Sequence, residues 1–486
     1  MTATDSIPDT TGAELDAALQ RANRAAEEMC AQPPAGRARQ LRAAADALDA
    51  AAAELVDLAR AESNLSEARL TGELARTTFQ LRLFAETADS GEFLHVVLDR
   101  ADPDFPLGPK PDLRRMLLPL GPVLVFAASN FPFAFSVAGG DTAAALAAGC
   151  PVLVKAHPGH PALSQRTAEI VGEALRSAGA PEGAFDVVFG FETGSNALQD
   201  PRIRAAAFTG SVPAGRALHD IAAARPDPIP FFGELGSLNP VFVTPGAVRA
   251  RGADIASGYV NSYCGNAGQL CTKPGLLFLP AGHGLGEALV GHARDAAAHP
   301  MLNERLHEGF EQRRREATEV PGVQVLVDGD AAGPSPTLLA ASVDTLLEHR
   351  EALLAEAFGP LSIVVEYDSP QEANRVAEAF AGNLTATVHA EDDEAGLVGG
   401  LVRRLRERAG RVLFNGWPTG VAVSPAMQHG GPYPATTDAR FTSVGTASIE
   451  RFLRPVTYQN APAGVLPEPL RDDNPWNIPQ TVHQPG

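Results

Sequence analysis

The chain has 486 residues, of which 45% are hydrophobic and 20% are charged, and its formal net charge is −19. This length exceeds what one simple core usually fills, so we expect two or three domains, and the composition excludes global disorder. Phosphate backbones and anionic lipids repel so acidic a chain, which argues against nucleic acid or a membrane as a partner.

The cysteine and terminal patterns indicate a reducing compartment. The chain has four cysteines, at positions 30, 150, 264 and 271, with no CxxC pair and no Cys/His cluster at zinc-ligand spacing. We therefore predict reduced thiols and no metal site. The first 30 residues lack a basic segment followed by an apolar run, so no signal peptide is expected and the predicted location is the cytoplasm.

The N-terminal segment is predicted to be helical. Residues 11–85 are rich in Ala, Leu, Arg and Glu, and Thr11 and Glu14 have the spacing of a capping box. A second notable segment, Met116–Gly140, carries no charged residue over 25 positions. Prolines and glycines interrupt it, so we predict a buried strand, a loop and a helix starting near Pro132 instead of a membrane span.

Short apolar runs alternate with helical stretches from about residue 120 onwards. In the first half of this region, strands are predicted over 124–126, 152–154, 185–189 and 205–208, with helices ending at Gly149 and covering 162–177 and 213–223. Strands without polar alternation have two covered faces, which is typical of a parallel sheet wound with helices, as in dinucleotide-binding domains. A second α/β series is predicted with strands over 276–279, 323–327, 361–367, 385–389 and 411–414. Beyond Ile449 the chain is Pro-rich and is predicted to lie on a neighbouring part or subunit.

Two residues are candidates for acid–base and nucleophilic chemistry. Cys271 lies in a polar, Gly-bounded loop, where a thiol can meet a ligand, although a lone Cys is more often a small core residue. Glu234 lies in the otherwise apolar run 231–236, where burial would raise its pKa and suit it to act as a general base; the alternative is a Glu that caps or pairs at a strand end. Cys30, Cys150 and Cys264 are assigned to packing.

Several polar residues follow predicted strands, at the edge where α/β proteins bind ligands. Asn130 is placed to donate to an oxyanion, or is simply a turn residue before Pro. Lys155 closes a strand, and the glycines of 190–194 and of 208–211 permit close approach of a pyrophosphate, each a weak signal alone. His157 and His160 are interpreted as loop histidines because no partner is spaced for metal binding.

Taken in order, Ser129-Asn-Phe-Pro132, Lys155, Phe208-Thr-Gly-Ser211, Glu234-Leu-Gly-Ser237, Gly268-Gln-Leu-Cys271 and Glu356-Ala-Phe-Gly-Pro360 resemble the aldehyde dehydrogenase superfamily. The resemblance implies that Cys271 is the nucleophile, Glu234 the general base, and Asn130 with the Cys271 backbone N–H the oxyanion hole. It also implies a nicotinamide dinucleotide site, with Lys155 at the ribose, Ser211 at the pyrophosphate, and Glu356 and Phe358 at the nicotinamide riboside. The full predicted cofactor set is Lys155, His157, Pro158, Gly190, Gly194, Phe208, Thr209, Gly210, Ser211, Leu235, Gly236, Glu356 and Phe358.

The resemblance further implies an aldehyde dehydrogenase-like α/β architecture of two Rossmann-like domains and a β oligomerisation arm. The expected division is 1–95 with 121–233 for the NAD(P)-binding domain, 234–440 for the catalytic domain, and 96–120 with 441–486 for the arm and C-terminal tail. A homodimer or homotetramer is expected.

Departures from the usual family pattern point to a branch. The chain has Ser237-Leu238 where Gly-Lys is common in the family, and its segment 423–438 is unusual. Together with Val154-Lys-Ala-His-Pro158, these two features resemble the α-ketoglutaric semialdehyde (2,5-dioxovalerate) dehydrogenase branch. The expected substrate is thus a small carboxylated aldehyde, with His429 and Lys273 as candidates to bind its distal carboxylate. Pro158 stands where NAD-preferring relatives usually carry Glu, which favours NADP with NAD as a second cofactor. The alternatives are an NADP-dependent long-chain or aromatic aldehyde dehydrogenase and an inactive binding protein of the same fold.

Overall fold

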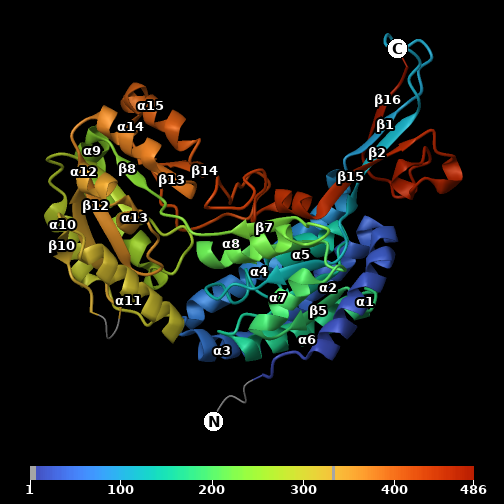
Figure 1. Cartoon of the computed structure of the whole chain (residues 1–486), viewed down its shortest axis with the longest axis horizontal. Helices are drawn as coiled ribbons and strands as arrows, with labels where there is room; N and C mark the ends of the chain where they lie inside the picture. Colours follow the sequence, from blue (N-terminus) through green and yellow to red (C-terminus); the bar gives the residue numbers. More distant parts are fainter. Residues whose placement is uncertain (1–6, 331–333, 486) are drawn as a thin grey trace.

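The computed structural model of the chain describes residues 7–330 and 334–485, and in this part it forms three β-sheets with helices around two of them. Figure 1 shows two α/β bodies side by side and a narrow arm that extends from one of them. The predicted mixed α/β fold class is confirmed.

The predicted helical segment at the N-terminus is confirmed, although it forms several helices. Thr11 and Glu14 make the expected capping box: the Glu14 N–H donates to Thr11 Oγ1 at 3.3 Å and the Thr11 N–H to Glu14 Oε2 at 2.8 Å. Pro33 and a left-handed Asn64 separate successive helices. The helices are α1 (Gly12–Ala31), α2 (Pro34–Ala50), α3 (Ala52–Ser63) and α4 (Glu67–Ser90).

The first body contains a five-stranded parallel sheet in the order β5-β4-β3-β6-β7. Its strands are β3 (Val123–Phe126), β4 (Val152–Lys155), β5 (Phe185–Val188), β6 (Ala205–Thr209) and β7 (Phe231–Glu234), and its helices are α5 (Gly140–Ala148), α6 (Pro161–Ser177), α7 (Phe191–Gln199) and α8 (Val212–Ala223). The predicted helix start near Pro132 is wrong, because the Phe133 and Ala134 N–H groups donate to the Glu73 side chain and residues 131–139 form turns. The continuous apolar runs of β3 and β4 are buried throughout.

The second body contains a seven-stranded sheet in the order β10-β11-β12-β9-β8-β13-β14, parallel except for the β10–β11 pair. Its strands are β8 (Val241–Val243), β9 (Leu276–Pro280), β10 (Gln324–Val327), β11 (Thr337–Ser342), β12 (Leu361–Tyr367), β13 (Asn383–His389) and β14 (Ala409–Phe414). Its helices are α9 (Pro245–Cys264), α10 (Gly286–Asp295), α11 (Glu304–Thr318), α12 (Val343–Glu348), α13 (Arg350–Leu353), α14 (Pro370–Ala379) and α15 (Ala395–Leu405). Strands β8 and β11 were not predicted, because the first is only three residues long and the second is rich in Ala, Ser and Thr.

The arm is a four-stranded sheet in the order β15-β2-β1-β16. Strand β2 (Leu113–Pro119) pairs antiparallel with β15 (Leu453–Gln459), and β1 (Val96–Asp99) pairs parallel with β16 (Gln480–His483), so segments from far apart in the chain lie side by side (Figure 1). Short 3-10 helices complete the described chain: Glu92–Leu94, Gly265–Gly268, Asp392–Glu394, Thr446–Phe452, Ala463–Val465 and Glu468–Leu470. Among the helices of the described residues, none is both long and apolar enough to cross a membrane.

Candidate active site

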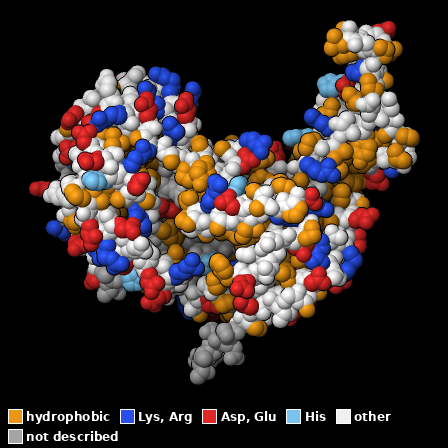
Figure 2. Space-filling model, in the orientation of Figure 1, with side chains coloured by type: hydrophobic (Ala, Val, Ile, Leu, Met, Phe, Trp, Pro, Cys, Tyr) orange, Lys and Arg blue, Asp and Glu red, His pale blue; other side chains and the backbone are white. Residues whose placement is uncertain are grey.

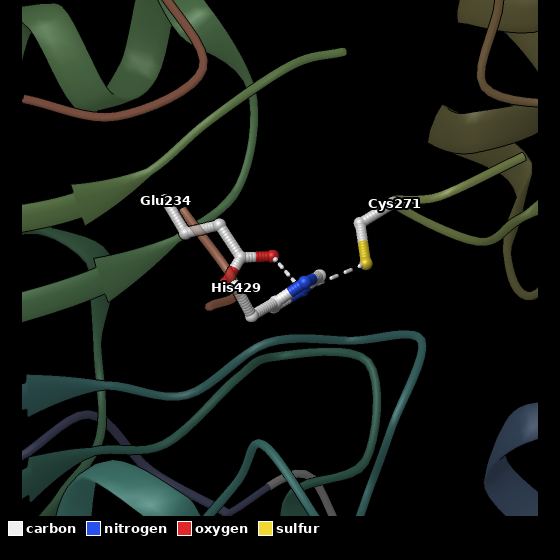
Figure 3. Close-up of side chains that lie close together, drawn as sticks. All are labelled: Glu234, Cys271 and His429. Atoms are coloured by element: carbon white, nitrogen blue, oxygen red, sulfur yellow. Dashed lines mark hydrogen bonds and ion pairs between the residues drawn. The ribbon is translucent and has the colours of Figure 1, made fainter. Parts of the chain in front are cut away.

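Glu234, Cys271 and His429 come from three distant segments and meet between the two bodies of the fold. Glu234 closes β7, Cys271 follows the 3-10 turn after α9, and His429 lies in the loop after β14. Cys271 Sγ is 3.5 Å from His429 Nε2, which in turn is 2.9 Å from Glu234 Oε1 (Figure 3). The Ser443 hydroxyl also donates to Glu234 Oε2. One imidazole nitrogen therefore faces both the thiol and the carboxylate.

The environment of this cluster sets the two key pKa values in opposite directions. Burial, and after it the nearby carboxylates of Glu234 and Glu356, raises the pKa of the Cys271 thiol well above its ordinary value. Burial also acts to raise the pKa of Glu234, but His429 and the Ser443 hydroxyl outweigh it and leave that pKa below its usual value. The predicted raised pKa of Glu234 is thus wrong, because the carboxylate has an imidazole partner that the local sequence does not reveal. At neutral pH the site holds a thiol beside an ionised carboxylate.

The same three side chains are also a possible ligand set for a metal, which the sequence did not suggest. Their donor atoms lie within 4.8 Å of one another. Thiolate, imidazole and carboxylate are the ligands that zinc prefers. No metal chemistry is needed for the steps proposed below, but assays of the thiol should contain a chelator so that an adventitious ion does not block it.

Asn130 lies buried next to the Cys271 loop. The side-chain Nδ2 of Asn130 donates to the Gln269 carbonyl at 3.0 Å, and the backbone carbonyl of Asn130 accepts from Arg69 Nη2 at 2.6 Å. One N–H of this side-chain amide is therefore used to fix its orientation. The second N–H is not part of that hydrogen bond. The role of Asn130 in an oxyanion hole stays a prediction. It is supported by the hydrogen bond to Gln269, which lies two residues before Cys271 in the chain.

A cavity of about 350 Å³ opens beside the Cys271 thiol. It is lined by aromatic rings, small polar side chains and one guanidinium: Arg76, Phe131, Phe135, Asn261, Ser262, Gly265, Asn266, Leu270, Cys271, Thr272, Thr419, Gly420, Val421 and His429. The size is that of a pocket for a small organic molecule. Cys271 and His429 both belong to its lining, so a ligand in it reaches the reactive cluster.

The predicted dinucleotide residues of the first body gather at the carboxyl edge of the five-stranded sheet. Lys155 ends β4, and Gly190 precedes α7 with a φ of 108°. Phe208 and Thr209 end β6, and Gly210 follows it. The hydroxyl of Ser211 caps the N-terminus of α8. His157 and Pro158 lie in the loop between Lys155 and α6, and Gly194 lies in α7, where a Cβ would come within 3.0 Å of the Lys155 side chain. Strand ends and helix N-termini of this kind suit a pyrophosphate.

The remaining predicted cofactor residues are Leu235 and Gly236, which directly follow Glu234 in the chain, and Glu356 and Phe358. Gly236 approaches Glu356 so closely that a Cβ there would lie 2.7 Å from Glu356 Oε2, so only glycine leaves this space open. Leu235 is buried, and its N–H donates to the Ala435 carbonyl at 2.7 Å; Phe358 is half-buried. Burial raises the pKa of Glu356 to about 7, while Lys273 opposes that shift. These residues fit a nicotinamide dinucleotide bridging the two bodies, and their contacts with it stay predictions.

Lys273 is not brought to the cavity. Its Nζ donates to the Leu361 carbonyl at 2.8 Å, and burial lowers its pKa to about 8 despite the attraction of Glu356. Its predicted alternative role, binding the distal carboxylate of a substrate, is therefore not supported. His429 does line the cavity, but it also contacts Glu234 and Cys271, a partnership that was not predicted.

The other three cysteines are free and lie away from this site. Cys150 is fully buried and its Sγ donates to the Phe452 carbonyl at 3.5 Å. Burial raises the pKa of Cys150 to about 11 and that of Cys264 to about 12, which makes both poor nucleophiles. Cys30 is half-buried in α1, and burial also raises its pKa.

The fold and the thiol–carboxylate site define an NAD(P)-dependent aldehyde dehydrogenase, and comparisons with known proteins agree. A family model described as the aldehyde dehydrogenase family matches residues 2–454, so the chain belongs to that family. It is 45% identical over 437 residues to the α-ketoglutaric semialdehyde dehydrogenase of Acinetobacter baylyi, covering 88% of this chain and 83% of that protein. It is 44% identical to α-ketoglutaric semialdehyde dehydrogenase 2 of Azospirillum brasilense, covering 96% and 91%. Among solved structures, a Thermus 1-pyrroline-5-carboxylate dehydrogenase with bound NAD matches with a TM-score of 0.76 at 22% identity, covering 93% of this chain and 86% of that one.

Proposed function

We propose that this enzyme oxidises α-ketoglutaric semialdehyde to 2-oxoglutarate. The observation that carries the proposal is the contact of Cys271, His429 and Glu234 at a cavity of substrate size. The names of the two relatives at 44–45% identity support the choice of aldehyde. A long-chain or aromatic substrate is disfavoured because the cavity lining contains Arg76 and several small polar side chains. An inactive binding protein is disfavoured because the nucleophile and the base lie together.

In the proposed first step, the Cys271 thiol attacks the aldehyde carbon. Its proton moves to the Glu234 carboxylate, which is ionised at neutral pH, and the S–C bond forms as the carbonyl electrons move to oxygen. His429 Nε2 lies 3.5 Å from Cys271 Sγ, so in the tautomer that carries the proton on this atom it stabilises the negative charge that develops on sulfur before the S–C bond is complete. In this proposal the Asn130 amide, which lies beside the Cys271 loop, and the Cys271 backbone N–H hold the alkoxide.

The second half releases the acid. A dinucleotide held at residues such as Lys155, Ser211 and Glu356 would supply the hydride acceptor that the oxidation of the thiohemiacetal on Cys271 to a thioester requires. After Glu234 has released its proton to solvent, it takes a proton from the attacking water, and collapse of the tetrahedral adduct expels the thiolate. The Ser443 hydroxyl holds the Glu234 carboxylate in place during both proton transfers.

We infer NADP as the preferred cofactor, with NAD as a second. Lys155 directly precedes the loop that follows β4, and the N-terminus of α11, where Arg305 lies, packs against this loop: a Cβ at Gly159 would be 3.7 Å from Asn303 Nδ2. Pro158 in this loop places no carboxylate against a 2′-phosphate. A phosphate there would gain from both cations.

Arg305→Ala is therefore expected to lower kcat/KM for NADP about tenfold and to change that for NAD much less, because one charge-assisted contact contributes about 1.5–3 kcal/mol. Initial rates with each cofactor at saturating aldehyde measure this. Arg315→Ala, an exposed arginine on the same helix α11, is the control and should change neither value. A wild-type enzyme that prefers NAD by a hundredfold would contradict the inferred preference.

We also propose that the arm mediates oligomerisation and that the 121–233 and 234–440 regions act as cofactor-binding and catalytic domains. Apolar side chains are exposed along the arm (Figure 2), among them Leu107, 92% exposed, and Val465, 66% exposed. Exposed apolar surface of this kind typically marks a protein contact. Such a homo-oligomer in the cytoplasm fits the expectation from the sequence.

The proposed substrate is tested by NADPH formation with α-ketoglutaric semialdehyde, succinic semialdehyde, glycolaldehyde and decanal. We expect kcat/KM for α-ketoglutaric semialdehyde to exceed the values for glycolaldehyde and decanal by at least about tenfold, since both lack the carboxylate and a lost charged contact costs about that factor. Succinic semialdehyde keeps the carboxylate but is one carbon shorter, and its value should be lower by a smaller factor. Product analysis should show 2-oxoglutarate. Comparable values for all four aldehydes would contradict the proposed specificity while leaving the family assignment intact.

A further inference from the structure

A guanidinium without a partner points into the substrate cavity. Arg76 lies on α4, lines the cavity that contains Cys271, and is the only Arg, Lys, Asp or Glu among the described lining residues. Its Nε and Nη2 atoms are buried and have no hydrogen-bond partner, and within residues 7–330 and 334–485 no carboxylate lies within 4.0 Å of it. Burying polar donors without partners is unfavourable, so such a group is expected to serve a ligand.

The nearest acidic side chain on α4 is already occupied. Glu73 Oε1 accepts from the Phe133 and Ala134 N–H groups at 2.8 and 3.0 Å, and Glu73 Oε2 lies 3.7 Å from Arg69. Glu73 attracts Arg76 through space but does not pair with it. The charge of Arg76 thus remains available to an anion that enters the cavity.

Neighbouring groups hold Arg76 in a place that can reach a small substrate. The guanidinium carbon lies 5.7 Å from the centre of the Phe135 ring, which packs edge-to-face with Phe131. Arg76 and Cys271 both line this cavity, so the guanidinium and the nucleophile face the same space. A molecule with an aldehyde at Cys271 and an anionic group a few bonds away would contact both.

We propose that Arg76 binds the carboxylate at the end of the substrate remote from the aldehyde, and thereby selects carboxylated over uncharged aldehydes. This rests on the proposed function for the choice of substrate. A planar guanidinium with free Nε and Nη2 donors matches a carboxylate in a bidentate pair. The two residues that sequence reasoning offered for this role are otherwise engaged: Lys273 faces Glu356 and Leu361, and His429 contacts Cys271 and Glu234.

The test compares two aldehydes of equal chain length, 5-oxopentanoate and pentanal, in Arg76→Met, which keeps an unbranched, flexible side chain and removes the guanidinium and its charge. The ratio of kcat/KM for 5-oxopentanoate to that for pentanal should fall by about 30-fold or more in Arg76→Met, and Arg76→Lys should recover part of it. Arg82→Met is the matched control, because Arg82 is on the same helix but pairs with Asp46 and Asp49 at the surface. It should leave the ratio unchanged.

A second readout keeps the test valid if a variant folds poorly. Binding of 2-oxoglutarate to the resting enzyme, measured by calorimetry, should weaken by a similar factor in Arg76→Met, with thermal unfolding recorded alongside. Equal loss for both aldehydes, or an unchanged ratio, would overturn the role of Arg76. The wild-type enzyme could prefer 5-oxopentanoate over pentanal through Arg76 and yet fail to oxidise α-ketoglutaric semialdehyde. That result would contradict the proposed substrate but would support carboxylate binding by Arg76.

Discussion

Cys271→Ala is expected to abolish aldehyde oxidation, with kcat lowered by more than about 10⁴-fold, because among the described lining residues of the cavity Cys271 alone carries a thiol that can form the thioester. Cofactor binding should persist, since the dinucleotide residues lie at the edges of the sheet and not at the sulfur. NADPH formation and fluorescence titration with NADPH measure the two properties separately, in buffer with a chelator.

The matched control for this substitution is Cys264→Ala, a half-buried thiol at the end of α9 that does not line the cavity. It should retain most of the wild-type activity. Normal turnover by Cys271→Ala would show that the nucleophile has been misassigned. The same conclusion would follow if Cys264→Ala stayed folded but lost its activity.

Glu234→Gln is expected to have the second largest effect, with kcat lowered about 10²- to 10⁴-fold, because both the thiol proton and the proton of the hydrolytic water lose their acceptor. Deacylation should become slow, so that rapid mixing shows a burst of NADPH close to one per active site followed by a slow steady state. The same substitution removes a negative charge that raises the pKa of Cys271. The pH at which iodoacetamide alkylates Cys271 half-maximally should therefore shift down.

The direction of that shift tests whether the Glu234 carboxylate acts on the Cys271 thiol at close range. A carboxylate without influence on the sulfur would leave the thiol profile of Glu234→Gln at the wild-type pH. An upward shift would mean that the carboxylate does not act on the sulfur as its burial and position indicate. Glu366→Gln, on β12 and exposed, serves as the control and should match wild type in both assays.

Much of the fold follows from local patterns in the sequence. The strands β3, β4 and β12 are built mainly of consecutive apolar residues, and the Thr11–Glu14 capping box fixes the start of α1, so each could be predicted from nearby residues. Errors arose where distant contacts decide the outcome. The start of α5 moves to Gly140 because Glu73, on another helix, binds the backbone at positions 133 and 134.

The site shows the same division. Cys271 and Glu234 could be predicted as catalytic candidates because each lies in an unusual local sequence context. The pKa of Glu234, however, depends on His429, which lies 158 residues from Cys271 in the chain. Arg76 was missed because, in sequence, it is one of many arginines in a helical segment. The sequence marked His429 only as a candidate for binding the substrate carboxylate, and its contact with Glu234 and Cys271 was missed. The departure of residues 423–438 from the usual family pattern is the one local signal for this segment.

Chemical quench of Glu234→Gln during its first turnover, followed by peptide mass analysis, tests most directly whether the sulfur at 271 bonds to the aldehyde carbon. We predict that the peptide containing Cys271 carries one acyl group derived from the aldehyde, formed only with cofactor present and in an amount equal to the NADPH burst. An NADPH burst of full size with no acyl group on that peptide would contradict covalent catalysis by Cys271.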